Sequence, residues 1–248
     1  MFYFRDFPRA AYIFGDQLEQ GGTTVTSDIF QDISLYTEVI DQVKDNVSFY
    51  SKYYIQENDR PDQVSFKLYG TTIYHWTFYF MNDHLRKQGW PLTLQQLERQ
   101  VKRDFPHKGF ISRADLTDHF LPGQVVRGLR SGATGEVLRR YLDIGVIIGD
   151  FTKNFEVGET VASVASGDRT LSSNVRSAFP EHLAPHHYEN AAGEVVDIDP
   201  FLGPGAQLTE VTNYDRYAKH NDALKEIIVI KPDLIQEVVA AFRQAIKS

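Results

Sequence analysis

The side chains best suited to bind a metal gather in the stretch EHLAPHHYE at positions 181–189. They are His182, His186, His187 and Glu189. His182 and His186 have the i, i+4 spacing that brings two imidazoles to one face of a helix, as a zinc site can require. Pro185 lies between them and disfavours that helix, because proline lacks the main-chain donor and clashes with the preceding turn. The stretch therefore indicates a turn with exposed histidines, and we expect neither a metal nor a cofactor.

Carboxylates suited to acid–base chemistry follow in VVDIDP, where Asp197 and Asp199 would project from one face of a strand. The prolines and glycines after them favour a solvated strand end instead. GLRSGATGE at 128–136 lacks the ending of a phosphate loop, and neither Gly-x-Ser-x-Gly nor His-Glu-x-x-His occurs. We therefore expect a protein that is not an enzyme, and the alternative is a hydrolase that uses these aspartates or the histidines.

The overall composition narrows the class of protein. The 248 residues carry a net charge of -7, are 42% hydrophobic and 13% aromatic, and include no cysteine. Such a chain folds, forms no disulfide and has no basic stripe for nucleic acid. Its N-terminus lacks the pattern of a secretory signal, and no apolar run approaches the roughly 18 residues of a membrane span. We expect a protein made in a cytoplasm, with no nucleic-acid or membrane partner.

Helix and strand signals alternate over the first 106 residues. In residues 1–50, Ser27 or Asp28 can cap a short helix with an apolar face of Ile33, Tyr36, Ile40 and Val43. SKYYIQ at 51–56 is a predicted strand. A helix follows in which Asp59 is the expected N-cap, Pro61 lies in the first turn and Gly70 is the stop. A second helix is expected over 72–82, and a third begins with a Thr93–Gln96 capping box and ends at Pro106.

The amino-acid composition changes between residues 110 and 184, where frequent glycine, threonine and valine predict short strands joined by turns. FLPGQVVRGLRSG (120–132) and FEVGETVASVASG (155–167) align at a constant offset of 35. The paired positions are Phe120 with Phe155, Gly123 with Gly158, Val126 with Val161, Ser131 with Ser166, and Gly132 with Gly167. Two related β-hairpins in a small sandwich or barrel are the simplest interpretation.

The C-terminal part, 185–248, returns to helix. Tyr214, Tyr217, Asn221 and Leu224 lie on related faces of one predicted helix, and IIVI at 227–230 is a predicted buried strand. The final helix follows Lys231-Pro232-Asp233, with its apolar face at Ile235, Val238, Val239, Phe242 and Ile246.

The stretch KLYGTTIYHWTFYFMND at 67–83 is unusually aromatic. On a helical wheel, Ile73, Trp76, Thr77 and Phe80 form one stripe, and Tyr74, Phe78 and Met81 form a second stripe beside it. The two stripes span roughly 200°, about twice what one core-facing side needs. The helix is therefore either buried in its own domain or packs one stripe against a partner, where Trp and Tyr are enriched.

These residues resemble the LysM pattern of a βααβ module, in which Tyr-Gly closes the first helix, a Trp fills the core and an Asn ends the second helix. The residues that carry the resemblance are Tyr53, Tyr54, Ile55, Tyr69, Gly70, Trp76, Asn82 and Asp83. Residues 84–91 offer no clear second strand. The resemblance implies a LysM-like module at 51–106. Together with the other signals, it leads us to expect an α+β fold with an N-terminal helical docking segment at 1–50, a β-rich insertion with two related hairpins at 110–184, and a C-terminal strand and helices at 185–248.

A wider set of residues resembles the baseplate wedge protein of contractile-tailed, T-even-like phages. This set adds Thr26 to Phe30, Arg60-Pro61, His187 to Asn190, Gly193, and the ending through Tyr214, Asn221, Lys225 and Ile227. The resemblance implies a non-catalytic clamp that joins neighbouring wedges, in six copies, within the virion tail baseplate. Its partners would be other wedge proteins, including those of the adjacent wedge.

The residues expected at such interfaces are Tyr54, Tyr69, Gly70, Tyr74, Trp76, Phe78, Asn82, Asp83, Tyr214 and Phe242. The alternative function is a LysM-type module that binds the N-acetylglucosamine chains of peptidoglycan.

Overall fold

A computed structural model describes residues 9–13, 27–31, 38–165 and 169–247. The fold is α+β, and the chain forms two compact units. Unit 1 comprises Met1–Pro91 and Asp222–Ser248, and unit 2 comprises Leu92–Asn221. The predicted organisation, with boundaries near residues 50, 106 and 184, stays a prediction. Unit 2 is thus an insertion between two parts of the chain that fold together.

Unit 1 begins with an antiparallel hairpin of β1 (Arg9–Ile13) and β2 (Ser27–Gln31). The helix predicted to begin at Ser27 or Asp28 is wrong, because both residues belong to β2, which pairs with β1. Helix α1 (Glu38–Asp45) starts later and buries Ile40 and Val43 as expected. The other predicted residues of that face, Ile33 and Tyr36, lie outside the described residues.

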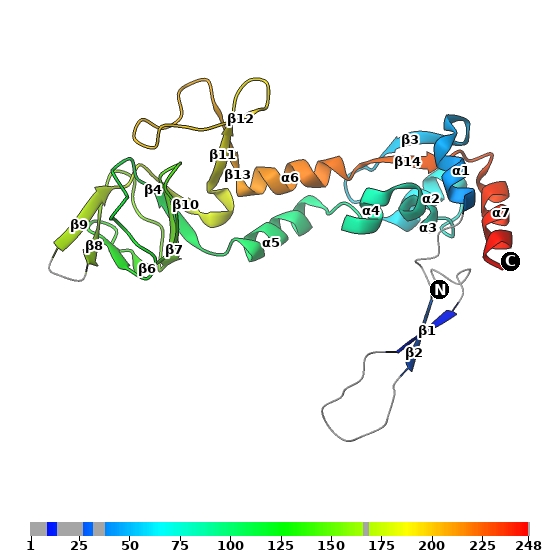
Figure 1. Ribbon diagram of the computed structural model, residues 1–248, viewed down its shortest axis with the longest axis horizontal. Helices are drawn as coiled ribbons and strands as arrows, with labels where there is room; N and C mark the ends of the chain where they lie inside the picture. The colour runs from blue at the N-terminus through cyan, green and yellow to red at the C-terminus, as the bar shows by residue number, and fades with distance from the viewer. Residues whose placement is uncertain (1–8, 14–26, 32–37, 166–168, 248) are drawn as a thin grey trace, which may run out of the picture. The chain divides into compact units, whose positions relative to one another are not determined.

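The centre of unit 1 is a two-stranded antiparallel sheet formed by distant segments. β3 (Tyr50–Tyr54) follows a 3-10 turn, η1 (Val47–Phe49), and pairs with β14 (Glu226–Ile230), so that Lys52 lies opposite Ile228. Figure 1 shows β3 and β14 side by side. Both predicted strands are confirmed. No strand occurs at residues 84–91, where α4 (Asp83–Gln88) lies, so β14 supplies the partner of β3.

Two helices stand between these strands in the sequence, α2 (Pro61–Tyr69) and α3 (Trp76–Met81). Pro61 and Gly70 bound α2 as predicted, and Gly70 takes φ = 70° and donates its N–H to the Phe66 carbonyl at 2.9 Å. Arg60 rather than Asp59 is the N-cap. Asp59 instead accepts the Trp90 indole N–H through its main-chain carbonyl at 2.7 Å.

Helix α3 is shorter than the predicted helix over 72–82, because residues 71–75 form turns before it. The β-branched Thr71, Thr72 and Ile73 disfavour a helix, and the Thr72 carbonyl is taken by the His75 ring at 3.0 Å. The last helix, α7 (Ile235–Lys247), is confirmed and buries Val238, Val239 and Phe242.

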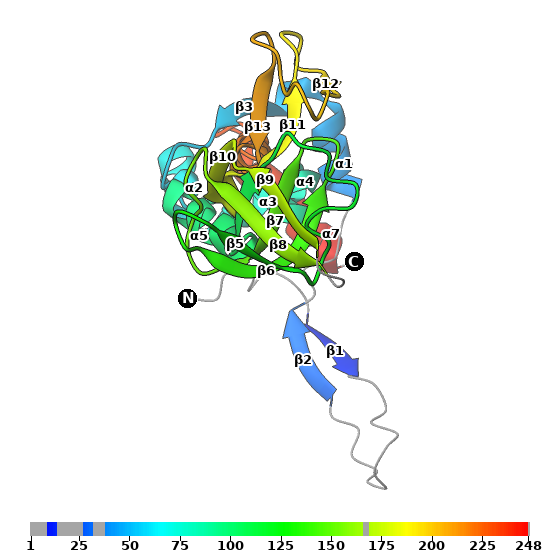
Figure 2. The same cartoon turned by 90° about the vertical axis from the view of Figure 1, so that its left-hand side faces the viewer.

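Unit 2 opens with α5 (Leu94–Asp104), whose predicted capping box is confirmed, since the Thr93 hydroxyl accepts the Gln96 N–H at 3.3 Å. A seven-stranded antiparallel sheet follows in the order β10-β4-β7-β6-β5-β8-β9. Its strands are β4 (Lys108–Ile111), β5 (Val125–Gly128), β6 (Thr134–Tyr141), β7 (Val146–Phe151), β8 (Thr160–Ala165), β9 (Arg169–Asn174) and β10 (Ser177–Pro180). Figure 2 shows that this sheet is curled. The prediction of short strands joined by turns at 110–184 is thereby confirmed.

The curled sheet has a core on each face. Its inner face is aromatic, with Phe110, Phe120, Phe151 and Phe155 buried together. The outer face packs Ile148 and Phe179 against Tyr188 of a three-stranded sheet. That sheet consists of β12 (Val195–Val196), β11 (Pro185–Glu189) and β13 (Thr209–Thr212), preceded by η2 (Glu181–Leu183) and followed by α6 (Asn213–Ala223).

The two segments of the internal repeat make equivalent contacts. Gly123 and Gly158 have φ of 88° and 80°, conformations that favour glycine. Gln124 Oε1 accepts the Leu121 N–H at 2.9 Å, and at the same offset Glu159 Oε1 accepts the Glu156 N–H at 2.6 Å. These contacts support the hypothesis of two related hairpins. The aligned Ser166 and Gly167 lie outside the described residues.

Glu159 gives the first testable prediction. Its buried carboxylate also accepts the N–H groups of Arg130 and Ser131 at 3.0 and 2.8 Å. Burial alone would raise the pKa of Glu159. The hydrogen bonds to its carboxylate together have a larger and opposite effect, so the pKa lies below the ordinary value. We expect Glu159→Gln to destabilise unit 2 by about 1–3 kcal/mol at neutral pH.

The pH dependence follows from the sign of that shift. A folded pKa below the unfolded value stabilises the protein above the unfolded pKa, and the contribution is lost as the pH falls through the folded pKa. Urea melts of both proteins from pH 7 to pH 2.5 should show the difference shrinking in acid. A difference that stays constant would contradict the prediction.

Candidate protein-interaction site

Trp76 is the largest buried side chain in the described residues and lies within unit 1. Its ring centroid is 4.9 Å from that of Phe242 in α7 and 5.7 Å from that of Phe80 in α3. The same cluster includes Ile40 of α1 and Ile230 of β14. Trp76 therefore joins four elements that are far apart in the sequence.

The second stripe of α3 is also covered by unit 1 itself. Phe78 is fully buried in a separate cluster with Ile55, Val64 and Leu85. The wide apolar arc is thus covered by two internal clusters, which favours the first of the two interpretations, a helix buried in its own domain. Trp76, Phe78 and Phe242 are buried in the core of unit 1 and have almost no exposed surface for contact with a partner.

Asn82 is likewise internal, and its role is to hold β14. Its Nδ2 donates to the carbonyls of Ile228 and Phe78 at 2.8 and 2.9 Å, and its Oδ1 accepts the Ile228 N–H at 2.9 Å. The side-chain amide thereby occupies the edge of β14 that β3 leaves unpaired. A buried main-chain edge needs such a partner, because unpaired polar groups away from water are costly.

Tyr69 binds the same edge of β14 at Ile230, two residues after Ile228. Its hydroxyl donates to the Ile230 carbonyl at 2.9 Å, and burial raises its pKa far above the ordinary value for tyrosine. The ring packs 6.1 Å from Phe78, centroid to centroid. The Tyr-Gly and Asn residues singled out in the sequence therefore fasten α2 and α3 to β14.

We predict that Asn82→Ala destabilises unit 1 by about 2–3 kcal/mol, since the N–H and the carbonyl of Ile228 would both lose their hydrogen bonds to Asn82 at a partly buried edge. Tyr69→Phe removes one hydrogen bond from the same edge and should cost about 1 kcal/mol. Chemical denaturation followed by tryptophan fluorescence measures both. Equal effects of the two substitutions would contradict the assigned role of Asn82.

Other predicted interface residues remain accessible. Tyr54 is 53% exposed on β3, Gly70 and Asp83 are exposed, and Tyr74 and Tyr214 are partly buried. Asp83 lies at the start of α4, where a 2.9 Å hydrogen bond from Lys44 holds the pKa of its carboxyl below the usual range. A role of these residues in binding a partner stays a prediction.

The structure also exposes apolar residues that were not singled out. Leu202 is 85% exposed and Phe201 is 55% exposed, next to the turn formed around Asp199. Phe66 on α2 is exposed as well. The signal that could have found the first pair is its setting, DPFLGPG, because two large apolar residues between prolines and glycines have no element in which to be buried.

No three of the His, Asp and Glu side chains in the described residues are grouped so that they could hold a metal ion. The Nδ1 atoms of His186 and His187 lie 2.8 Å apart, and His187 Nε2 lies 3.2 Å from Glu189 Oε1. Burial, together with nearby Arg216, lowers the pKa of His186. Asp199 accepts the N–H of Phe201 at 2.8 Å, so its carboxylate organises a turn.

Comparison with known proteins gives a match for the N-terminal part of unit 1, which contains Tyr69, Trp76 and Asn82. Residues 2–95 match the family model of base plate wedge protein 53. The matched segment covers less than half of the chain. It includes β3, α2, α3 and Asn82, and it ends close to Pro91, where unit 1 gives way to the insertion. No curated protein matches the chain.

The match to the wedge family supports a structural role in a phage tail baseplate, association with other baseplate proteins and a location in the virion. Such a role is consistent with a protein that is not an enzyme. No helix in the described part of the chain is long and apolar enough to cross a lipid bilayer.

Proposed function

We propose that the chain is a structural component of a phage tail baseplate wedge that clamps neighbouring wedges together through protein–protein contacts, without catalysis. The observation that carries the proposal is the match of residues 2–95 to the wedge family. Partners are other wedge proteins, including those of the adjacent wedge, and the chain is present in six copies per contractile-tail baseplate.

The surface of each unit supplies apolar anchors for such contacts. Tyr54 and Phe66 are exposed on unit 1, and Phe201 and Leu202 are exposed on unit 2. At about 25 cal/mol per Å² of apolar surface buried, a standard-sized interface supplies ample gross free energy before the cost of ordering. Repetition around a ring then multiplies modest contacts through effective concentration.

We also infer that β3, α2, α3 and β14 form a LysM-like βααβ module, with unit 2 inserted before its second strand. The order of the elements and the antiparallel pairing of β3 with β14 support this inference. So do the contacts of Tyr69 and Asn82 with β14. The same module motivates the alternative function, binding of N-acetylglucosamine chains in peptidoglycan.

A phage with an early stop codon in this gene tests the proposed function. We expect tail assembly to stop before the baseplate is complete and to resume when the chain is supplied from a plasmid. A plasmid copy with Asp197→Ala should restore assembly fully, because the proposed role needs no catalytic carboxylate. Normal tails without the chain would refute the structural role, and failure of Asp197→Ala alone would favour a hydrolase.

A further inference from the structure

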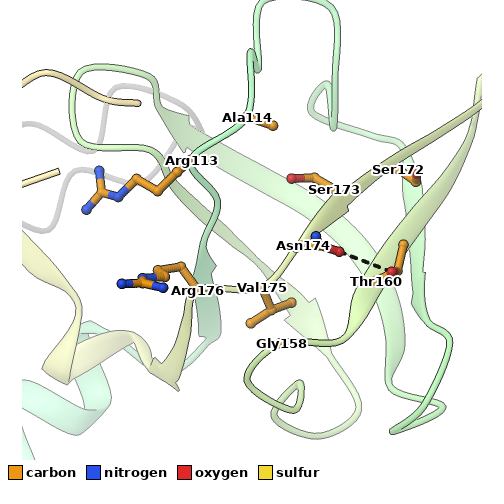
Figure 3. A pocket seen from close by; sticks show the side chains of 9 residues that line it. All are labelled: Arg113, Ala114, Gly158, Thr160, Ser172, Ser173, Asn174, Val175 and Arg176. Carbon is orange, nitrogen blue, oxygen red and sulfur yellow. Dashed lines mark hydrogen bonds between the residues drawn. The ribbon is translucent and has the colours of Figure 1, made fainter. Parts of the chain in front are cut away.

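Main-chain pairing does not close the curled sheet of unit 2 between its edge strand β9 and the segment after β4, where the Ser112 and Ser173 hydroxyls form a hydrogen bond across the seam. A pocket of about 670 Å³ lies at this seam, with Arg113 and Ala114 on one side and the end of β9 on the other. Figure 3 shows the side chains of Arg113 and Arg176 pointing toward the same side of the pocket. Ser172 and Asn174 supply polar groups on the β9 side.

Hydrogen bonds at the end of β9 reveal which way its main chain faces. The Val175 N–H donates to the Glu159 carbonyl at 2.9 Å, and the Val175 carbonyl accepts the Gly158 N–H at 2.7 Å. The main-chain polar groups of Val175 therefore point toward the β8 side. The next residue, Arg176, turns its N–H the other way and donates to the Ile111 carbonyl of β4 at 2.7 Å.

Because main-chain groups alternate in direction along a strand, those of Ser172 and Asn174 face the seam, as those of Arg176 do. In the described residues β9 pairs only with β8 and is the last strand of the sheet. The seam-facing N–H and carbonyl groups of Ser172 and Asn174 therefore form an open edge that can accept another strand.

The charges beside this edge indicate what kind of strand it would accept. Arg113 donates from Nη1 to the carbonyls of Ile144 and Pro200 at 3.1 and 3.2 Å, which fixes its guanidinium group. Arg176 is exposed, and no described carboxylate forms an ion pair with it. Arg113 also interacts electrostatically with the carboxylate of Glu210, so Arg176 is the exposed cation of the pocket lining, in a chain whose net charge is -7.

We infer that the seam binds an extended segment of a partner protein, which adds to β9 as a strand and places an acidic side chain opposite Arg176. Main-chain hydrogen bonds would supply affinity, and the arginine–carboxylate pair would supply specificity. The pocket lies outside the residues that match the wedge family, so the inference holds independently of the baseplate role.

The test uses the full chain and a fluorescein-labelled peptide in which threonine and aspartate alternate, so that all carboxylates lie on one face of the strand. One control peptide replaces each aspartate by asparagine, and another replaces each threonine by proline to remove main-chain donors. Fluorescence anisotropy at low salt should show that both controls bind at least about tenfold more weakly than the acidic peptide.

Variants of the protein make the test specific to the seam. Arg176→Gln should weaken binding of the acidic peptide about tenfold. The matched control, Arg127→Gln, removes the same charge from an exposed position on β5 and should leave binding unchanged. Ser172→Pro should abolish binding and leave the melting temperature near that of the parent, since proline is tolerated where an edge N–H faces outward.

Three outcomes would overturn the inference. The first is equal binding of the asparagine peptide, or no effect of Arg176→Gln. The second is retained binding by Ser172→Pro with full competition by inorganic phosphate, which would identify a simple anion site. The third is a dimer of the chain that Ser172→Pro converts to a monomer, which would make a second copy the occupant.

Discussion

Trp76→Ala is expected to destabilise unit 1 by about 3–5 kcal/mol, the range for truncating a large buried aromatic side chain. The indole packs against Phe242 and Phe80 and shares a cluster with Ile40 and Ile230. Its removal would leave a cavity where α1, α3, α7 and β14 meet, and none of these elements can move inward without disturbing the others. Total stabilities of only 5–15 kcal/mol are typical, so the substitution would remove a large part of the free energy of unfolding.

Urea unfolding followed by circular dichroism measures this loss. Phe66→Ala is the matched control, because it also truncates an aromatic residue of unit 1 but at an exposed position, where effects within about 0.5 kcal/mol are usual. If Trp76→Ala melts like its parent, the ring is not part of the core, and the account of α3 given above is wrong.

Phe242→Asp is expected to prevent unit 1 from folding around α7. Phe242 is fully buried against Trp76 and Phe80, at ring-centroid distances of 4.9 and 5.6 Å. The substitution removes that packing and places a carboxylate in an apolar cluster, where an unpaired charge is strongly disfavoured. The last helix would detach from α1 and α3.

The matched control is Gln244→Asp, which adds the same charge to an exposed position two residues later on α7. Limited proteolysis should release the C-terminal helix from the Phe242→Asp protein and spare the Gln244→Asp protein. Equal resistance of the two variants would mean that α7 does not depend on this contact. It would also reopen the view of Phe242 as a residue that docks on a partner.

Local signals in the sequence predicted local structure well. Pro61 and Gly70 bound α2, and the Thr93–Gln96 box begins α5, because caps and stops act within one turn of the chain. The prediction of a helix after Ser27 was wrong because a contact between distant segments decides the structure there. Pairing of β2 with β1 is a contact between segments, and such a contact overrides the capping tendency of a single residue.

Long-range features could not be found in the same way. Nothing near residues 84–91 revealed that the partner strand of β3 lies at β14, beyond an inserted unit. The aromatic excess of α3 suggested a partner because the residues that cover it, such as Ile40 and Phe242, lie far away in the sequence. Tyr69 and Asn82 were singled out by resemblance, and only the structure shows that they fasten β14.

The proposed baseplate role is tested most directly by quantitative mass spectrometry of purified, intact phage tails from a producing culture. We expect to find the chain there at a copy number equal to that of the other wedge proteins. Its absence from tails, together with sedimentation of the purified chain with peptidoglycan, would contradict the structural role and favour glycan binding by the proposed LysM-like module.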